Sequence, residues 1–451
     1  MERTKISGLV SWLTKKHRKP LIVWGARQIG KTHLIKELFA KRYFKEFIYI
    51  DVKKDDEARA FFSTTSDAAK YISYIETRFG KKLTKDVLLM FDEVQTCHQV
   101  LSALKYFCQD FPEIPVIATG SLVRLSLKHS ESENQDDAFL FPVGKVNSLF
   151  LYPVSFEEYL LNTNQVLLQT IREHYQTKTP MESFQHELAM NALHEYLTIG
   201  GMPEALDIFI QEKSYVDATD TLKEIYANYL SDMDTYNISS ETILKTRNVY
   251  LNIFKQLNKE NKNFKISQLE KGKSNRDYFN AYQWLELAQV VYRSRNMTGK
   301  ITLPLQEEKE GLFRLYLSDV GIFTFQSQVS QADFFVRDRR NTLSGIFYEN
   351  YVACELKSHE LPLFYWTGKS THEFEFITAS GGKIYPIDVK KSKGGLNSLK
   401  EFRDYNGNCT AIKIASQNFG YNAEHDILTI PQYATFLLAE EIAQNEGIQI
   451  Q

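Results

Sequence analysis

The stretch that decides the fold is PLIVWGARQIGKTHLIKEL, residues 20–38. Its letters LIVW form an apolar run that stops at Gly25, which predicts a short buried strand, and THLIKEL places apolar residues at helical spacing. Between them lies the spacing GxxxxGKT, which ends in Lys31 and Thr32. A strand, a glycine loop and a helix in this order are typical of a phosphate-binding loop.

The residue types in this loop suit the phosphates of a nucleotide. Glycines let backbone N–H groups converge on a phosphate, a lysine neutralises phosphate oxygens, and a hydroxyl at the start of the helix ligates magnesium. We therefore predict bound ATP with Mg²⁺, and Thr32 as one ligand of the metal. The predicted nucleotide-binding residues are Gly25, Ala26, Arg27, Gln28, Ile29, Gly30, Lys31, Thr32 and His33.

Two later strands supply the groups that hydrolysis needs. The apolar strand VLLMFDEVQ ends in Asp92 and Glu93, so that one carboxylate can reach the metal and the next can polarise an attacking water. The strand IPVIATGS offers the hydroxyls of Thr119 and Ser121 at its tip, which can lie between the two phosphate-site elements. We predict Asp92 as a metal ligand, and Glu93 and Ser121 as catalytic residues.

Strand-like and helix-like stretches alternate through the first third of the chain. FIYIDV at 47–52 and NSLFLYPVSF at 147–156 add two more apolar runs. This alternation predicts an α/β fold, with a parallel P-loop NTPase sheet over residues 1–155. The polar, acidic stretch at 128–138 is predicted to be a mobile loop, with a partner contact as the alternative.

Composition limits the class of protein. With 451 residues the chain should form two or three domains, because single cores rarely exceed roughly 250–300 residues. Its 43% hydrophobic content excludes a disordered chain, and a net charge of -2 argues against wholesale wrapping by nucleic acid. Four cysteines without CxxC spacing, and no apolar run near ~18 residues, predict a cytoplasmic protein that does not enter a membrane.

Residues 156–240 are predicted to form a helical lid, because apolar residues recur three and four apart in SFEEYLL, FQHELAMNALHEYL and TDTLKEIYANYL. The segment IGGMPEAL interrupts this pattern, since two glycines and a proline break a helix sharply. It is either a hinge or nucleotide-sensing turn, or a plain turn between helices.

Residues 241–325 fit a winged helix-turn-helix. RNVYLNIFKQLN and NRDYFNAYQWLELA are helix-like, and VVYRSRNMTGKITLPL follows as a two-stranded wing. Basic residues outnumber acidic ones between Lys255 and Lys300, which suits contact with DNA phosphates. A protein contact is the alternative, because charged helix faces are usually only solvated.

Residues 340–451 carry a second group of carboxylates. The helix-like GIFYENYVACELKS holds Glu349 and Glu355, which are separated by about 240° of helix rotation and so cannot face one metal.

Strand-like segments follow with Glu375, Asp388 and Lys390, and strand alternation places Asp388 and Lys390 on one face. Carboxylates from a helix and two strands can hold magnesium beside a lysine that activates water for phosphodiester attack. A salt-bridged sheet face is the alternative.

Taken together, these segments resemble the prokaryotic AAA-type ATPases that join a P-loop domain and a winged helix to a C-terminal PD-(D/E)xK nuclease-like domain. The segments that carry the resemblance are GARQIGKT, LLMFDEVQ, IATGS, YPVSFEEYL, GGMPEAL, LYLSDVGI, GIFYENYVACEL, HEFEFI and YPIDVK. The resemblance implies ATP and magnesium at the glycine loop and Asp92, and Glu93 as the water-polarising residue. It also implies a restriction-endonuclease-like α/β domain with Glu349, Glu375, Asp388 and Lys390 as a nuclease-like site.

We therefore expect an ATP-hydrolysing switch or remodeller that acts on a DNA or protein partner. The alternatives are an ATP-regulated DNA nuclease and a signalling or defence module whose assembly, as an oligomer, depends on ATP. Glu375 and Asp388 stand where nuclease-like members carry an aspartate and a glutamate, so these two side chains either compensate for each other across a metal or mark an inert fold.

Overall fold

The computed structural model divides the chain into two compact units, which we call the N-terminal unit, Glu2–Tyr152, and the C-terminal unit, which begins at Pro153. The first domain boundary was predicted at residue 155. The structure describes residues 1–121, 142–235, 239–307, 311–329, 344–368, 372–390, 397–407, 409 and 411–444. The acidic stretch predicted as a loop at 128–138 lies outside these residues.

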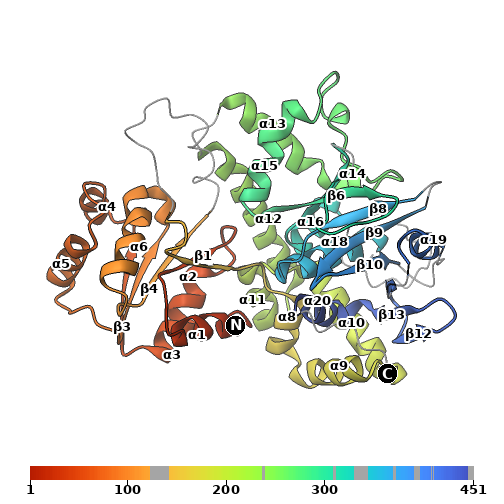
Figure 1. The fold of residues 1–451 in the computed structure, drawn as a ribbon, viewed down its shortest axis with the longest axis horizontal. Coiled ribbons are helices and arrows are strands. Elements are labelled where there is room, and N and C mark those ends of the chain that lie inside the picture. Colours follow the sequence, from red (N-terminus) through yellow and green to blue (C-terminus); the bar gives the residue numbers. More distant parts are fainter. Residues whose placement is uncertain are drawn as a thin grey trace. The chain divides into compact units, whose positions relative to one another are not determined.

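The N-terminal unit is built on a five-stranded parallel sheet with the order β2-β3-β4-β1-β5 (Figure 1, red to orange). Its strands are β1 (Leu21–Trp24), β2 (Glu46–Asp51), β3 (Val87–Asp92), β4 (Val116–Gly120) and β5 (Asn147–Phe150). β1 and β3 are buried along their whole length, as expected of strands covered on both faces. The predicted parallel sheet is confirmed, including a fifth strand beside β1.

Helices connect these strands and cover the sheet. They are α1 (Ile6–Thr14), the continuous helical stretch α2 (Lys31–His33), η1 (Leu34–Ala40) and α3 (Lys41–Tyr43), then α4 (Asp56–Phe62), α5 (Ala68–Phe79), η2 (Val94–Thr96) and α6 (His98–Asp110). One core cluster joins Phe62 of α4, Tyr71 of α5 and Phe107 of α6 to Phe91 of β3. These aromatic rings meet edge-on or tilted, with Phe62 and Phe91 centroids 5.6 Å apart.

The strand order determines which side chains share an edge of this sheet. β4 lies between β1, which precedes the glycine loop, and β3, which ends in Asp92. Because all the strands are parallel, their carboxyl ends meet at one edge. The tip of β4 is therefore held between the two phosphate-site elements, as the sequence predicted.

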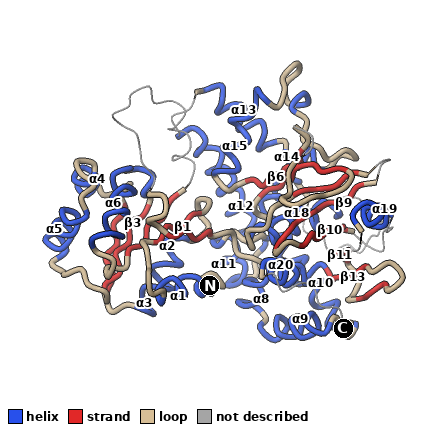
Figure 2. The backbone as a smooth tube through the Cα atoms, in the orientation of Figure 1, coloured by secondary structure: helices blue, strands red, loops and turns tan. Residues whose placement is uncertain are grey.

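The C-terminal unit contains an eight-stranded mixed sheet with the order β12-β13-β11-β10-β9-β8-β6-β7 (Figure 2, red). Its strands are β6 (Val291–Thr298), β7 (Phe313–Leu317), β8 (Phe364–Thr367), β9 (Glu373–Ser380), β10 (Lys383–Val389), β11 (Ala411–Ala415), β12 (Gly420–Asn422) and β13 (Ile427–Pro431). The middle of this sheet, β8, β9 and β10, is an antiparallel meander. β11 then joins β10 in parallel.

Helices of the C-terminal unit precede the sheet and are also interleaved with its strands. Those before β6 are α8 (Phe156–Thr163), α9 (Gln165–Thr177), α10 (Ser183–Ile199), α11 (Pro203–Glu212), α12 (Tyr215–Asp232), η5 (Met233–Thr235), α13 (Ser240–Leu251), α14 (Ile253–Leu257), η6 (Ile266–Gln268), η7 (Arg276–Tyr278) and α15 (Phe279–Leu287). The later ones are α16 (Val320–Ser327), α18 (Ser344–Ser358), α19 (Asn397–Asn406), η8 (Gln432–Ala434) and α20 (Thr435–Ala443). No helix among the described residues is long and apolar enough to cross a membrane.

The predicted two-stranded wing is not formed. Residues 291–298 form the single strand β6, and the described residues that follow, 299–307, contain no strand. β6 pairs instead with β7 and, in parallel, with β8, so it belongs to the large sheet. The physical reason is burial, since Val291, Ser294 and Met297 of β6 are buried, whereas a wing projects into solvent. The predicted boundary between residues 325 and 340 consequently divides one sheet.

The glycine pair that interrupts the predicted lid forms a close crossing between α10 and α16. A Cβ on Gly201 would lie 2.1 Å from the Val154 carbonyl oxygen, and one on Gly321 would lie 2.2 Å from the Ile199 oxygen. Asp319, fully buried at the start of α16, accepts hydrogen bonds from the backbone N–H groups of Gly201 at 2.6 Å and Ile322 at 2.9 Å. This turn is therefore fixed by packing and capping, which favours the plain interhelical turn.

Candidate functional site

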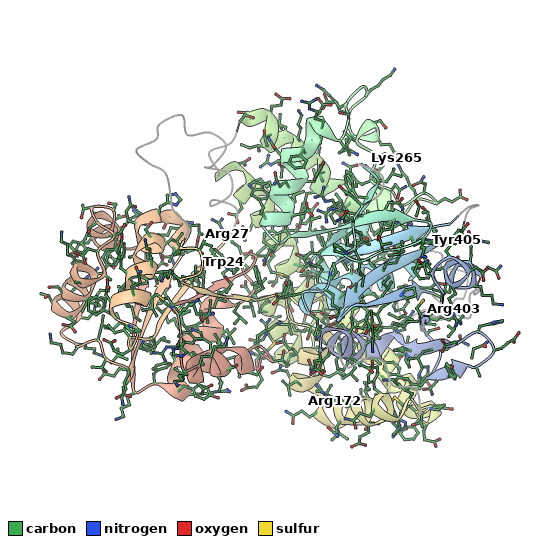
Figure 3. All side chains as sticks on the ribbon, viewed as in Figure 1. Trp24, Arg27, Arg172, Lys265, Arg403 and Tyr405 are labelled. Atoms are coloured by element: carbon green, nitrogen blue, oxygen red, sulfur yellow. The ribbon has the colours of Figure 1, made fainter. Side chains whose placement is uncertain are left out.

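The glycine loop begins where β1 ends and curls tightly before α2. Gly25 allows a close approach, because a Cβ there would lie 2.4 Å from Ile29 Cδ1 and 2.6 Å from the Leu151 carbonyl oxygen. Gly30 has φ 85°, a left-handed conformation that favours glycine, directly before the helix. Figure 3 labels Trp24, the last residue of β1, and Arg27 in the loop. The loop thus has the shape that the spacing predicted.

Lys31 is buried at the centre of this loop. Its ammonium donates hydrogen bonds to the carbonyl oxygens of Gly25 at 2.9 Å and Ala26 at 2.7 Å. Burial lowers the pKa of Lys31 to about 8, although Glu93 and Asp92 oppose this shift. The lysine is therefore held on weak, neutral acceptors that phosphate oxygens can replace.

The Asp92 carboxylate is the centre of the site. Its Oδ2 accepts hydrogen bonds from the hydroxyls of Thr32 at 2.7 Å and Tyr49 at 3.0 Å. Its Oδ1 accepts one from the Thr119 hydroxyl and one from the backbone N–H of Glu93. Burial and the nearby Asp92 charge raise the pKa of Tyr49, so this phenol stays a donor. One carboxylate therefore joins the start of α2 to the ends of three neighbouring strands.

Glu93 follows directly in a left-handed conformation, with φ 56°. Its side chain accepts a hydrogen bond of 2.6 Å from the Gln95 amide, and the amide oxygen of Gln95 accepts the backbone N–H of Ser121 at 3.3 Å. Gln95 is buried, and Gly120 leaves room for it, because a Cβ at Gly120 would lie 2.7 Å from its oxygen. Gln95 therefore orients the Glu93 carboxylate.

The structure distinguishes the two hydroxyls predicted at the tip of β4. Thr119 bonds to Asp92, whereas Ser121 contributes its backbone N–H to Gln95. These contacts favour Thr119 over Ser121 as the hydroxyl between the two phosphate-site elements. At the loop, Arg27 is half-buried, and Gln28 and His33 are exposed.

One residue that holds the loop could not be found from its sequence context. Arg3 is buried, and its guanidinium donates to the carbonyl oxygens of Ile29 at 3.2 Å and Tyr152 at 2.7 Å. It therefore fixes the loop apex to the segment after β5. The opening MERTK carries no motif that predicts this role, so the contacts of Arg3 are seen only in the structure.

The residues around Asp92 fit a magnesium ion. The Thr32 hydroxyl and an Asp92 oxygen, 2.7 Å apart, form a pair of hard oxygen donors beside the loop that would hold the phosphates. Magnesium commonly uses one or two such protein ligands and takes the others from phosphates and water. Thr32 and Asp92 are therefore the residues that would hold the ion.

The structure also brings together the predicted nuclease-like residues, but with cations between them. Glu349 of α18 and Glu375 of β9 both form ion pairs with Lys262. Asp388, at the end of β10, forms an ion pair of 2.6 Å with Lys390. Glu355 lies apart, as the helical spacing predicted, and accepts the backbone N–H of Phe156 at 3.1 Å.

The charges of this second group are matched internally. Burial tends to raise the pKa of Glu375, but Lys262 and Lys390 outweigh it and hold the pKa below its ordinary value. Burial and the Glu375 charge raise the pKa of Asp388. Among the residues that the structure describes, no three His, Cys, Asp or Glu side chains are arranged to hold a metal ion. The residues in this arrangement therefore do not fit the metal that a nuclease-like site implies.

Comparison with known families identifies the first part of the chain. Residues 17–160 match the family described as AAA domain. Residues 190–333 and 344–433 match two domains of unknown function, DUF8612 and DUF4143. Residues 17–160 therefore form an AAA-type P-loop ATPase domain, and the helix-turn-helix and nuclease-like parts stay predictions.

Individual relatives are distant. Uncharacterized protein MJ1637 of Methanocaldococcus jannaschii is 25% identical over 208 residues, which cover 44% of this chain and only 40% of that protein. The Walker-type ATPase PABY2304 of Pyrococcus abyssi is 14% identical, with a TM-score of 0.41 over 72% of this chain and 95% of that one. The Thermotoga maritima RuvB Holliday junction branch migration motor is 12% identical, with a TM-score of 0.28 over 65% and 90%.

The lowered pKa of Lys31 predicts proton uptake when ATP binds. Phosphate oxygens favour the charged ammonium, so binding raises a pKa that is about 8 in the free protein. ATP affinity should thus fall as the pH rises above about 8, approaching tenfold per pH unit. Calorimetry in buffers of different ionisation enthalpy measures both the affinity and the proton uptake.

The control for this prediction is Lys31→Ala. It should bind ATP weakly near neutral pH and lose little more affinity at higher pH, because it has no ammonium to deprotonate. An affinity equal to that of the wild type, or a wild-type affinity that does not change between about pH 7 and 9, would contradict this role of Lys31.

Proposed function

We propose that this chain hydrolyses ATP and that the hydrolysis drives its action as a switch or remodeller on a DNA or protein partner. The observation that carries the proposal is the Asp92 carboxylate, which is bonded to Thr32 at 2.7 Å and followed directly by Glu93. Neighbouring groups at one edge of the sheet can therefore bind the nucleotide phosphates, hold the metal and act on the attacking water.

Each group has a separate task in hydrolysis. Lys31 leaves the loop carbonyls and neutralises phosphate oxygens, while the backbone N–H groups of the loop surround them. Bound Mg²⁺ supplies positive charge against the phosphates as negative charge shifts to the leaving group. Asp92 and Thr32 would hold the ion, and the hydroxyls of Tyr49 and Thr119 keep Asp92 in position.

Glu93 acts on the water. Its carboxylate takes a proton from the attacking water as the new bond to phosphorus forms. Gln95 holds that carboxylate through a hydrogen bond of 2.6 Å from its amide and is thus a positioning residue. Because Gln95 also accepts the N–H of Ser121, the orientation of Glu93 is linked to the tip of β4.

Glu93→Gln should separate binding from hydrolysis. The amide keeps the shape of the side chain but cannot accept the proton, so ATP should still bind while turnover falls by about 10²- to 10⁴-fold, or roughly 3 to 5 kcal/mol of barrier. Phosphate release and ATP affinity are measured on the same samples. Glu113→Gln, an exposed glutamate of the same unit, is the matched control and should behave as wild type.

A turnover rate of Glu93→Gln within about threefold of the wild type would show that another group activates the water. Loss of ATP binding together with turnover would show that Glu93 is needed to build the site. Either result contradicts the task assigned to this residue.

A cluster of basic side chains favours DNA as the partner. Lys271 and Arg276 are exposed and Lys273 is half-buried, in the segment between η6 and α15. Lys271 and Arg276 form no ion pair with another described residue, whereas the Lys273 charge also acts on the Glu241 and Asp277 carboxylates. The charges of Lys271 and Arg276 are therefore the ones most available to phosphates. The β6 strand that follows is not a wing, so this proposal rests on the charge cluster alone.

Replacing Lys271, Lys273 and Arg276 with alanine should weaken DNA binding to a similar extent for different sequences. The dependence of log K on log salt should flatten by about one unit for each lost phosphate contact. Fluorescence anisotropy at several salt concentrations measures this slope. The exposed lysines Lys70, Lys223 and Lys383, changed together, remove the same charge elsewhere and serve as control.

An unchanged slope in the cluster variant would show that these three side chains do not contact phosphate and would return the segment to a protein-contact role. An equal loss in the control variant would assign the binding to net charge alone. Absence of DNA binding by the wild type would leave a protein as the partner.

A further inference from the structure

The carboxylate cluster of the C-terminal unit contains a cation supplied by the chain itself. Lys262, from the segment between α14 and η6, lies with its ammonium between Glu349 Oε2 and Glu375 Oε1, the latter at 3.2 Å. Both glutamate side chains are almost completely buried. Two buried carboxylates this close require a cation, because desolvation and mutual repulsion disfavour both charges.

Every oxygen of these two glutamates is engaged by a donor. Glu349 Oε1 accepts the Tyr316 hydroxyl at 2.6 Å and lies 3.5 Å from the Arg314 guanidinium, while Lys262 holds its other oxygen. Glu375 Oε2 accepts the backbone N–H of Val389 at 2.9 Å. A metal ion would have to displace one of these donors before it could bind.

Cations also offset the carboxylate charge. Lys262, Lys390 and Arg314 contact the carboxyl groups of Glu349, Glu375, Asp388 and Glu373, and Arg314 lies closer to Glu373, at 2.7 Å, than to Glu349, at 3.5 Å. Burial and the Glu375 charge raise the pKa of Asp388, which favours its neutral form. Such a group exerts little net attraction on a divalent ion. A magnesium site instead needs surplus carboxylate charge and oxygens without donors.

The segment that carries Lys262 is docked firmly on the sheet. The residue after it, Asn263, accepts the Tyr365 hydroxyl of β8 at 2.6 Å. Next, the backbone N–H of Phe264 donates to the Phe313 carbonyl of β7 at 2.8 Å, and the two rings stack with centroids 6.0 Å apart. These contacts fix the backbone next to Lys262. The position of the lysine at the cluster therefore follows from the fold of the chain and not only from the conformation of its long side chain.

We infer that Lys262 takes the place of a metal ion in this cluster and closes it to divalent cations. In this arrangement the carboxylates predicted for a nuclease-like site are held by the chain's own cations and are closed to the metal that phosphodiester cleavage needs. Lys262 instead joins α18 to β9 as an internal counter-ion. This inference does not depend on ATP hydrolysis, since it concerns residues of the C-terminal unit only.

Removing the ammonium should create a divalent-cation site. Lys262→Met keeps the apolar stem but leaves Glu349 and Glu375 without their shared cation, so the pair should attract Mn²⁺. The probe is Mn²⁺ alone, titrated into nucleotide-free full-length protein and followed by electron paramagnetic resonance. Asp92→Asn is present in all samples, so that the ATP site does not contribute.

We expect Lys262→Met to bind Mn²⁺ at least about tenfold more tightly than its Asp92→Asn parent, and Mn²⁺ to raise its melting temperature. Adding Glu375→Gln to Lys262→Met should remove both effects. Lys259→Met, an exposed lysine of the same segment, and Lys262→Arg, which keeps the cation, are the controls and should bind no more Mn²⁺ than the parent.

Two results would overturn the inference. The first is Mn²⁺ binding by the parent that is lost on Glu375→Gln, which would show that the cluster takes a metal with Lys262 present. The second is folded Lys262→Met without Mn²⁺ binding, which would show that the lysine is not what excludes the ion. Lys262→Ser, which leaves space for water, answers the same question where the methionine variant does not fold.

Discussion

The N-terminal unit depends on one carboxylate that accepts hydrogen bonds from several elements. Asp92 ends β3 and accepts the hydroxyls of Thr32 at the start of α2, Tyr49 of β2 and Thr119 of β4. A buried carboxylate is stable only when such donors surround it. The same hydrogen bonds that satisfy the charge therefore align the loop, the helix and the strand tips, and the ATP site is a consequence of how the sheet edge is held together.

The buried carboxylates of the C-terminal unit have a different kind of hydrogen-bond donor. Around Asp92 the donors are neutral hydroxyls, which leave the negative charge available to a cation, whereas Glu349 and Glu375 share the ammonium of Lys262. Neutral donors preserve a site for an external ion, while an internal ammonium neutralises it. In this chain the type of group that contacts the carboxylates, more than their number, therefore decides whether a site can bind a metal ion.

Features that depend on residues close together in the chain could be predicted from the sequence. The glycine loop, the strand ending in Asp92 and the placement of Glu349 and Glu355 on different faces of one helix follow from spacing alone. From the sequence we predicted Ser121, whereas the contacts favour Thr119, because β4 ends at Gly120 and Ser121 lies beyond the strand. Contacts between distant residues left no local pattern either. Lys262 is 87 residues from Glu349, and β6 pairs with β7 and β8 of the large sheet rather than with the residues at 299–305.

Asp92 is expected to organise a working ATPase. The rate of phosphate release from ATP in Mg²⁺ by wild type and by Asp92→Asn tests this, with the fold of both checked by thermal unfolding. We expect Mg²⁺-dependent hydrolysis by the wild type and a loss of at least about 10²-fold in the variant, because the amide retains the shape but loses the charge that would hold the metal. Hydrolysis by a folded Asp92→Asn at the wild-type rate would contradict it.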